Sequence, residues 1–292
     1  MKSVIPYFLV LVAAVLWGTT GTAQSFLPQD AQPLTIGASR LAIGGFSLLL
    51  VMMIAKKINF RSWPWGITII AALCMALFQP LFFTSVRVTG IAIGTVVAIG
   101  SAPIFSGLIE WLFLKMKPSR AWAFATALSV IGCSLLFLNK DALTVHPLGV
   151  TLSLIAGFVF AIYTIVSKKL LEKVEAIPAV AMTFSISACM LMPFLFIFNS
   201  SWVVEPSNIW TILYLGFMTT SVAYILYLLG LKKVPSSSAV TLSLGEPLTA
   251  AVLSVFIVGE ILSPVSWVGV LLLLGGIIVL TFSGRKRAKQ VE

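Results

Sequence analysis

Residues 231–280 read LKKVPSSSAVTLSLGEPLTAAVLSVFIVGEILSPVSWVGVLLLLGGIIVL. Two apolar runs begin in this stretch, at residues 236–258 and 264–283, and together they hold one charged residue, Glu246. A helix crosses the hydrocarbon core of a bilayer with about 20 apolar residues. Lipid-exposed loops cannot cross it, because each unpaired peptide group in hydrocarbon costs several kcal/mol. The stretch therefore predicts two membrane-spanning helices.

The same pattern recurs along the whole chain. We predict ten spans, at residues 4–23, 33–55, 63–86, 91–114, 121–138, 147–167, 177–198, 208–231, 236–258 and 264–283. Composition agrees, since 59% of the 292 residues are hydrophobic and 10% are charged. Soluble domains average about 25% charged residues. The predicted fold class is an all-α membrane protein with ten transmembrane helices.

Basic residues gather in alternate connections between these spans. With a cytoplasmic N-terminus, 16 of the 19 fall on the inner side; Arg87 and Lys140 fall outside, and Arg40 lies within a span. The 16 are Lys2, Lys56, Lys57, Arg61, Lys115, Lys117, Arg120, Lys168, Lys169, Lys173, Lys232, Lys233, Arg285, Lys286, Arg287 and Lys289. Short loops rich in Lys and Arg favour the cytoplasm. We therefore predict a multi-pass protein of the cell (inner) membrane, embedded in the lipid bilayer, with both termini cytoplasmic. The net charge of +10 is then a topology signal, and we predict no nucleic-acid partner.

The first span has an alternative interpretation. Lys2, the apolar run after it and the small residues Gly21 and Ala23 resemble a signal peptide cleaved after Ala23. Cleavage would leave nine spans and would place the C-terminal basic cluster outside if the rest shifted. A retained helix agrees better with the charge pattern.

The chain also repeats itself weakly. A shift of 144 residues places Pro103 on Pro247 and Gly132 on Gly276, and a shift of 143 places Trp17-Gly18 on Phe160-Ala161. Five spans in each half make the two halves cross the membrane in opposite senses, and such inverted repeats are typical of secondary transporters. We predict one five-helix repeat at 1–140, a second at 147–284 and a basic cytoplasmic tail at 285–292.

The quoted stretch resembles the second-half signature of the EamA family in the drug/metabolite transporter superfamily. The matching residues are Glu246-Pro247, Gly259-Glu260, Pro264, Gly269 and Gly275-Gly276, and Leu16-Trp17-Gly18 is similar to the family's first helix. The resemblance implies ten helices and transport of amino acids, other metabolites, amines, sugars or drugs. The first half departs from the pattern, because Ala102-Pro103 replaces an acid–Pro pair and Lys115-Met116 replaces Gly-Glu. A carboxylate role would thus depend on the second half alone.

Glu246 is the leading candidate for a substrate- or proton-binding residue. A charge near mid-depth costs about 2.5–3.5 kcal/mol on insertion scales. Pro247 lacks the backbone donor that would reach the Ser243 carbonyl, so we expect a free carbonyl beside the carboxylate, suited to a proton or an ammonium group. Burial disfavours the charged carboxylate and a nearby Arg40 would favour it. The alternative is a structural Glu246 that stays protonated or caps a neighbouring helix.

Six further residues complete the predicted site: Arg40, Trp17, Tyr163, Tyr224, Gln79 and Pro103, with Pro247 beside Glu246. Arg40 could hold a substrate carboxylate through its planar fork; alternatively, it snorkels to the headgroups or pairs with Glu246. The deep aromatic rings could hold a cation, whereas most buried rings simply pack. We expect the helices of Pro103 and Pro247 to face each other across a central cavity, with the fifth and tenth helices at the periphery.

Three other polar features receive simpler interpretations. We expect Glu110 to form an interfacial ion pair with Lys115, and Glu260 to be a solvated helix end. The cluster Ser236, Ser237 and Ser238 is typical of a helix N-cap.

Enzyme chemistry finds little support in this sequence. The chain has one histidine, His146, and no metalloprotease, nucleotide-binding or cysteine-pair motif. Its three cysteines lie within predicted spans at different depths and indicate packing residues, so we predict no metal site and no cofactor. Without a nucleotide site, transport must use gradients or exchange.

We therefore predict a secondary transporter that moves a small amphipathic metabolite by alternating access. Efflux of an amino acid or amine is favoured, and cationic drug export or metabolite uptake is the alternative. Proton coupling and a homodimer are left open. A channel should show a continuous polar stripe, which the sequence lacks, and a scaffold would need neither Glu246 nor the paired prolines.

Overall fold

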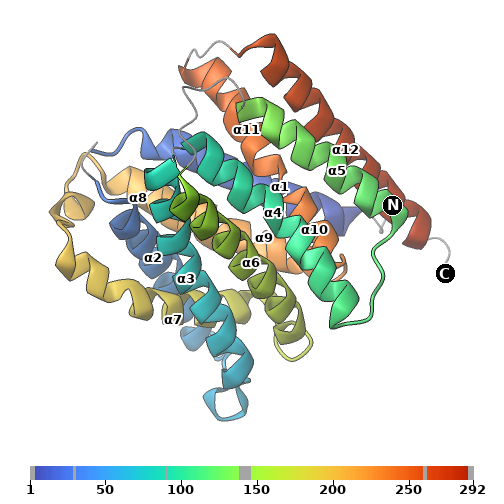
Figure 1. Ribbon diagram of the computed structural model, residues 1–292. Helices are drawn as coiled ribbons and strands as arrows, with labels where there is room; N and C mark the ends of the chain where they lie inside the picture. The colour runs from blue at the N-terminus through green and yellow to red at the C-terminus, as the bar shows by residue number, and fades with distance from the viewer. Residues whose placement is uncertain (1–3, 29–30, 90, 138–145, 259–261, 289–292) are drawn as a thin grey trace.

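The first predicted repeat folds into five helices. They are α1 (Ile5–Gln24), α2 (Pro33–Ile54), α3 (Trp65–Thr89), α4 (Ile91–Leu112) and α5 (Arg120–Phe137). This computed structural model describes residues 4–28, 31–89, 91–137, 146–258 and 262–288, and all regular elements within these ranges are helices (Figure 1). A short 3-10 turn, η1 (Phe60–Ser62), lies between α2 and α3.

The second repeat also makes five crossings, from more pieces. Its elements are α6 (Pro147–Leu170), α7 (Ala176–Ile197), η2 (Ser201–Val204), α8 (Ile209–Gly216), η3 (Phe217–Val222), α9 (Ala223–Leu231), α10 (Ser236–Leu242), α11 (Gly245–Leu253), η4 (Ser254–Val258) and α12 (Pro264–Ala288). The elements α8, η3 and α9 form one crossing, and α10, α11 and η4 form another, with η3 and η4 wound as π-helix. α12 runs on to Ala288, past the boundary at 284 that we expect from the sequence.

Length and composition identify membrane spans among these helices. Nine segments of the described chain are long and apolar enough to cross a bilayer, and the apolar run of α5, Arg120–Leu136, is a tenth and shorter one. Three crossings, α2, α6 and α12, begin at Pro33, Pro147 and Pro264. Proline suits this position, because the first N–H groups of a helix have no partner within it. The predicted all-α, ten-helix fold class is confirmed.

The close contacts between α5 and α12 occur twice, at positions related by the internal repeat. A Cβ atom added to Gly132 of α5 would lie 2.7 Å from the Gly269 carbonyl oxygen of α12, and one on Gly276 would lie 2.7 Å from the Ala125 carbonyl oxygen. Shifting each partner by 144 residues turns the first contact into the second. The two helices therefore cross by the same small-residue packing twice, as expected for two repeats related by a shift of 144 residues.

Equivalent pairs of helices from the two repeats also pack together in the rest of the bundle. α1 packs against α9 and α11, and α6 packs in the equivalent way against α3 and α4, while α2 packs against α7. The pair α5 and α12 lies along one edge of the bundle (Figure 1). Trp17 of α1 and its counterpart Phe160 of α6 meet with ring centroids 6.3 Å apart. Counterpart residues of the two repeats therefore contact each other in the aromatic interior of the bundle.

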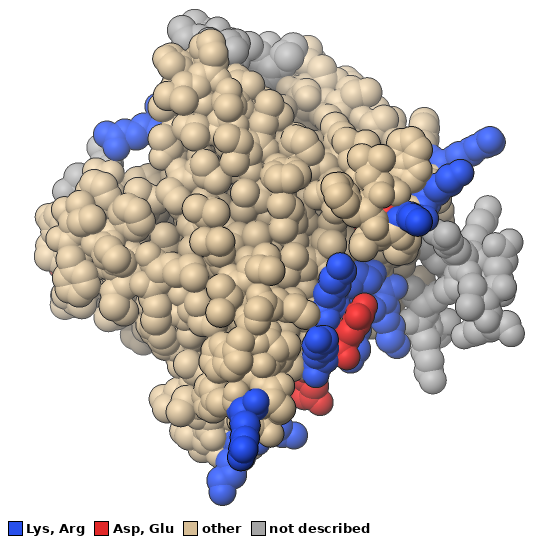
Figure 2. Space-filling model, turned by 60° about the horizontal axis from the view of Figure 1, so that its bottom comes forward, with Lys and Arg blue, Asp and Glu red and all other residues tan. Residues whose placement is uncertain are grey.

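Charged side chains gather at one end of the molecule. Figure 2 shows Lys and Arg concentrated there beside a broad surface without charge. We call this the basic end; it comprises the connections α2–α3, α4–α5, α6–α7 and α9–α10, and α1 begins and α12 ends there (Figure 1). Large apolar side chains such as Phe8, Leu271 and Phe282 are exposed on the bundle. Such a surface suits lipid.

Candidate functional site

Six buried or half-buried rings meet at the centre of the bundle. We call them the aromatic centre: Trp17, Phe160, Tyr163, Phe184, Tyr224 and Tyr227. Tyr224 is the hub, with ring centroids 4.5 Å from Phe184, 4.7 Å from Trp17 and 6.0 Å from Tyr163. The structure thus brings together the three aromatic residues that the sequence singles out, from α1, α6 and α9.

Three members of this group, Phe160, Phe184 and Tyr227, are not among the predicted site residues. Phe184 of α7 carries no motif, and only its ring contacts with Tyr224 and Tyr163 identify it. Phe160 has a signal, because the shift of 143 residues aligns it with Trp17. Trp17 Nε1 is buried without a hydrogen-bond partner among the described residues, whereas the Tyr227 hydroxyl lies 2.9 Å from Thr164 Oγ1. The centre therefore contains an indole N–H that is free to donate to a ligand.

The two intramembrane charges flank this centre. Glu246 lies in the first turn of α11, and α1 packs so closely there that a Cβ on Gly18 would lie 2.7 Å from the Glu246 carbonyl oxygen. Arg40 of α2 interacts electrostatically with both Glu246 and Tyr224. Among the described residues the two charges form no direct ion pair, and Arg40 Nε has no hydrogen-bond partner.

Burial decides between the interpretations of Arg40. Its side chain is 8% exposed, so it does not snorkel to the surface. Glu246 is partly exposed. The arrangement is a cation and an anion held near each other inside the bundle without direct pairing.

The helix that carries Glu246 is broken just before it. α10 ends at Leu242 and α11 begins at Gly245, and the Glu246 N–H donates to the Ser243 carbonyl across 2.9 Å. The expectation of a free Ser243 carbonyl is therefore wrong, because the tightened turn supplies another donor. The break instead places the carboxylate in the first turn of a new helix, where the helix dipole favours negative charge.

Gln79 of α3 is fully buried, and neither its amide nitrogen nor its amide oxygen has a hydrogen-bond partner in the part of the chain that the structure describes. A Cβ on Gly37 would lie 2.9 Å from its Oε1, so the amide lies against α2 one turn from Arg40. Burying an unpaired amide costs several kcal/mol. This position is suited to a ligand that supplies the missing partners.

The paired prolines are both buried, Pro103 within α4 and Pro247 within α11. α4 contacts α10, the basic-end half of the crossing that contains Pro247, while α5 and α12 pack against each other. These placements agree with prolines turned away from lipid. A cavity between the two helices stays a prediction.

The position of Glu110 contradicts two predictions, its ion pair with Lys115 and the N-cap role of the serine cluster. Its side chain is 3% exposed, and its Oε1 accepts the Ser236 N–H across 2.7 Å, so it caps α10 instead of pairing with the exposed Lys115. The N-cap position of α10 is Pro235, which has no side-chain cap. The serine cluster therefore forms the first turn of α10, and the Glu110 carboxylate of α4 caps the N-terminus of that helix in its place. Glu260 lies outside the described residues.

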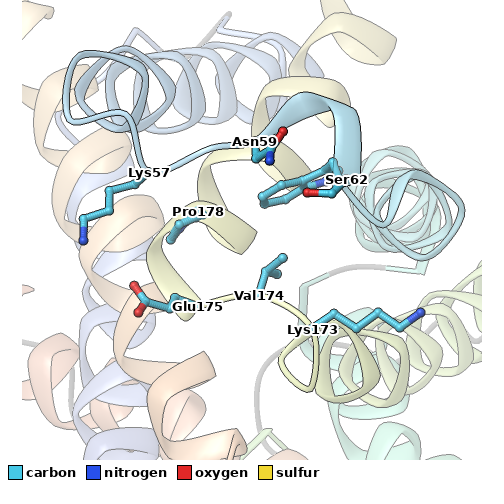
Figure 3. Close-up of a pocket in the computed structure, with 8 residues that line it drawn as sticks. Lys57, Asn59, Ser62, Lys173, Val174, Glu175 and Pro178 are labelled. Atoms are coloured by element: carbon cyan, nitrogen blue, oxygen red, sulfur yellow. The ribbon is translucent and has the colours of Figure 1, made fainter.

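Two surface pockets open at the basic end. The larger, about 300 Å³, lies between the α2–α3 and α6–α7 connections, and Figure 3 shows Lys57 and Lys173 in it pointing in opposite directions. Diverging cations do not form a paired anion site. The smaller pocket, about 140 Å³, is lined by Glu110, Trp122, Ser237 and Ser238 among others. Neither is lined by Arg40, Glu246 or a member of the aromatic centre.

Comparison with known proteins identifies the family. Residues 4–138 and 147–282 both match the EamA-like transporter family. The chain belongs to this family. It is 46% identical over 287 residues to the uncharacterized transporter YwfM of Bacillus subtilis, covering 98% of this chain and 97% of that one. It is therefore a multi-pass membrane transporter of small molecules and not an enzyme.

More distant relatives agree on the class. Identity is 26% to the uncharacterized inner membrane transporter YicL of Salmonella typhimurium, over 96% of both chains. It is 29% to the threonine/homoserine exporter RhtA of Escherichia coli, over 99% of this chain and 95% of that one. A solved crystal structure superposes with a TM-score of 0.84 at 18% identity, covering 96% of this chain and 98% of that one, and supports the fold.

Proposed function

We propose that this EamA transporter is an inner-membrane carrier that exports a small amino acid by alternating access. The observation that supports this most directly is the pair of opposite charges, Arg40 and Glu246, beside the aromatic centre without a direct ion pair between them. A zwitterion carries the complementary charges. It would satisfy both groups at once, whereas a neutral sugar would satisfy neither.

Each part of an amino acid has a suitable group in the site. The guanidinium of Arg40 is a planar fork that matches a carboxylate, and the unpartnered Gln79 amide lies one turn away. Glu246 suits the ammonium group, and the faces of Trp17 and Tyr224 add cation–π attraction. Pro103 and Pro247 would place helix bends at the same depth.

Direction and coupling extend the proposal. The E. coli relative named a threonine/homoserine exporter supports efflux here. Basic residues of the α2–α3, α4–α5, α6–α7 and α9–α10 connections support a cytoplasmic basic end and cytoplasmic termini. Glu246 would carry a proton when it does not hold the substrate, which couples export to proton entry. The repeats 1–140 and 147–284 would be the bodies that rock about this site.

A thermal-shift experiment on the purified protein tests the substrate class. L-threonine should raise the unfolding temperature, because a ligand at a hundred times its Kd stabilises the folded state by about 2.7 kcal/mol. Butyrate and propylamine, which carry only one of the two charges, should do much less. Equal shifts from propylamine and threonine would contradict a role for Arg40.

Cationic drug export is the second candidate, because rings of the aromatic centre lie beside a carboxylate. Tetraphenylphosphonium would be its probe in the same experiment. A shift with this cation and none with threonine would overturn the amino-acid proposal in favour of the alternative.

A further inference from the structure

Three hydrogen bonds join the two repeats at the basic end. Glu110 Oε1 of α4 accepts the Ser236 N–H of α10 at 2.7 Å. Thr241, one turn further along α10, receives the Trp122 indole N–H at 3.1 Å and lies 2.9 Å from Thr126 Oγ1, both from α5. We call these contacts the basic-end latch. They are largely buried, so water competes with them little.

Lys168 of α6 holds the same turn from the other side. Its Nζ donates to the Val234 carbonyl, and it interacts electrostatically with Glu110. The turn between α9 and α10 is thus fixed by an anion at an N–H group and by a cation at a carbonyl. Hydrogen bonds with one ionised partner are roughly twice as strong as neutral ones.

The latch breaks the symmetry of the repeats. The shift of 144 that aligns the prolines places Ser254 opposite Glu110 and Val270 opposite Thr126, and the shift of 143 that aligns Trp17 with Phe160 places Ser25 opposite Lys168. The charged latch residues therefore have no charged counterparts at the other end of the molecule. Hydrogen bonds also join the repeats at the other end, from Ser266 to the Leu136 carbonyl and between Thr19 and Tyr214, but they involve only neutral groups. The charged contact at the basic end therefore biases the equilibrium toward closure there.

A pocket lies on the seam that the latch closes. The 140 Å³ pocket is lined by Glu110 and Trp122 from one repeat and by Ser237 and Ser238 from the other. Behind it, the buried hydroxyls of Ser237 and Thr241 follow one face of α10 toward Gly245 and Glu246. The chain continues from α10 into the turn that presents Glu246.

We infer that the described conformation is closed at the basic end, that the seam between α4, α5 and α10 is the mouth of the transport pathway there, and that Glu110 keeps it shut. This inference rests on the proposed alternating-access function. Glu110 acts as a positioning residue: it fixes the N-terminus of α10 and contacts no substrate.

Cysteine accessibility in purified protein tests the gate without any substrate. Cys74, Cys133 and Cys189 are first replaced by Ala, and Ser237, which is 3% exposed, becomes the single reporter through Ser237→Cys. Glu110→Ala should speed its reaction with a charged maleimide at least tenfold. Glu110→Gln, which keeps an acceptor oxygen, should give a smaller increase, and Glu175→Ala at an exposed basic-end position should give none.

A second reporter separates gate opening from general loosening. Ser266→Cys lies at the opposite end, where Ser266 is 3% exposed and donates to the Leu136 carbonyl. Its labelling rate should stay unchanged in Glu110→Ala. Equal acceleration at both ends, or no acceleration at Ser237→Cys, would overturn the gate. If Glu110→Ala does not fold, Thr241→Val removes the other two latch contacts and should open the same reporter.

The gate and the substrate proposal fail separately. Accelerated labelling without any threonine-induced thermal shift would retain the gate and reject the amino-acid assignment. A threonine-induced shift with unchanged labelling in Glu110→Ala would do the reverse.

Discussion

The two crossings that contain the paired prolines differ in continuity. α4 runs unbroken from Ile91 to Leu112 through Pro103, whereas its counterpart stops at Leu242 and restarts at Gly245, two residues before Pro247. Proline inside a helix costs about 3 kcal/mol or more, and glycine adds about 1 kcal/mol. Glycine stands two residues before Pro247 but three before Pro103. Both crossings thus carry a glycine and a proline within one turn, but only the second is broken there, and the broken turn presents Glu246.

The other polar groups of the site are also unevenly shared. Arg40 and Gln79 belong to the first repeat, where the shifts place them on Thr183 and Ala223 of the second. Glu246 belongs to the second, where its counterpart is Ala102. The repeats share a scaffold of prolines and glycines, while each contributes different charges. The site is complete only when the two are packed together.

The largest expected effect comes from removing the charge that distinguishes the repeats. Glu246→Gln keeps the side-chain shape and should lower proton-driven L-threonine transport in proteoliposomes at least tenfold, equivalent to about 1.4 kcal/mol. Ala102→Ser, a small polar change at the matched, buried position of α4, should retain most activity. Glu175→Gln, at an exposed position, serves as the charge control. A wild-type rate and an unchanged pH dependence for Glu246→Gln would make Glu246 structural.

The next effect concerns the contact that the repeats share. Gly132→Val and Gly276→Val should each lower the free energy of unfolding by roughly 1–3 kcal/mol, because an added side chain overpacks the α5–α12 crossing. The two variants should be similar, since the contacts are related by the repeat. Gly275→Val is the matched control, because a Cβ there meets nothing within 4 Å. Thermal unfolding of the purified variants measures the difference. Equal loss at Gly275 would contradict the packing argument.

A smaller and opposite effect is expected at Gln79. Gln79→Met keeps the length and removes two unpartnered polar atoms, so it should raise the free energy of unfolding by about 1–3 kcal/mol. If the amide contacts substrate, transport should fall as stability rises. Thermal unfolding and L-threonine transport, measured on the same preparation, check both. A destabilised variant would show that the amide has a partner in the folded protein.

The mildest perturbation tests the opposite orientation of the repeats. Asn59 and Ser207 are exposed in the equivalent connections α2–α3 and α7–α8. In intact cells Ser207→Cys should react with an impermeant thiol reagent and Asn59→Cys should not, with transport unchanged in both. Labelling of Asn59→Cys alone would reverse the membrane orientation, and labelling of both would contradict opposed repeats.

The amino-acid sequence alone determines where this chain crosses the membrane and that it does so ten times. Hydrocarbon excludes unpaired peptide groups, so apolar length fixes the crossings, and α2 (Pro33–Ile54) agrees with the predicted 33–55 to one residue. The depth of a residue in the membrane can also be predicted from the sequence, because each helical residue rises about 1.5 Å. That is why Trp17, Tyr163 and Tyr224 could be predicted as deep residues.

Tertiary structure decided which neighbours those residues meet. Glu110 caps α10 and does not pair with Lys115. Phe184 belongs to the aromatic centre, and the Ser243 carbonyl accepts a hydrogen bond from the Glu246 N–H. None of these follows from depth, because a helix of given length can rotate about its axis and choose its neighbours. Rotation is set by close contacts such as Gly18 against α11, between residues more than 200 positions apart. Periodicity within one helix carries no information about such distant partners.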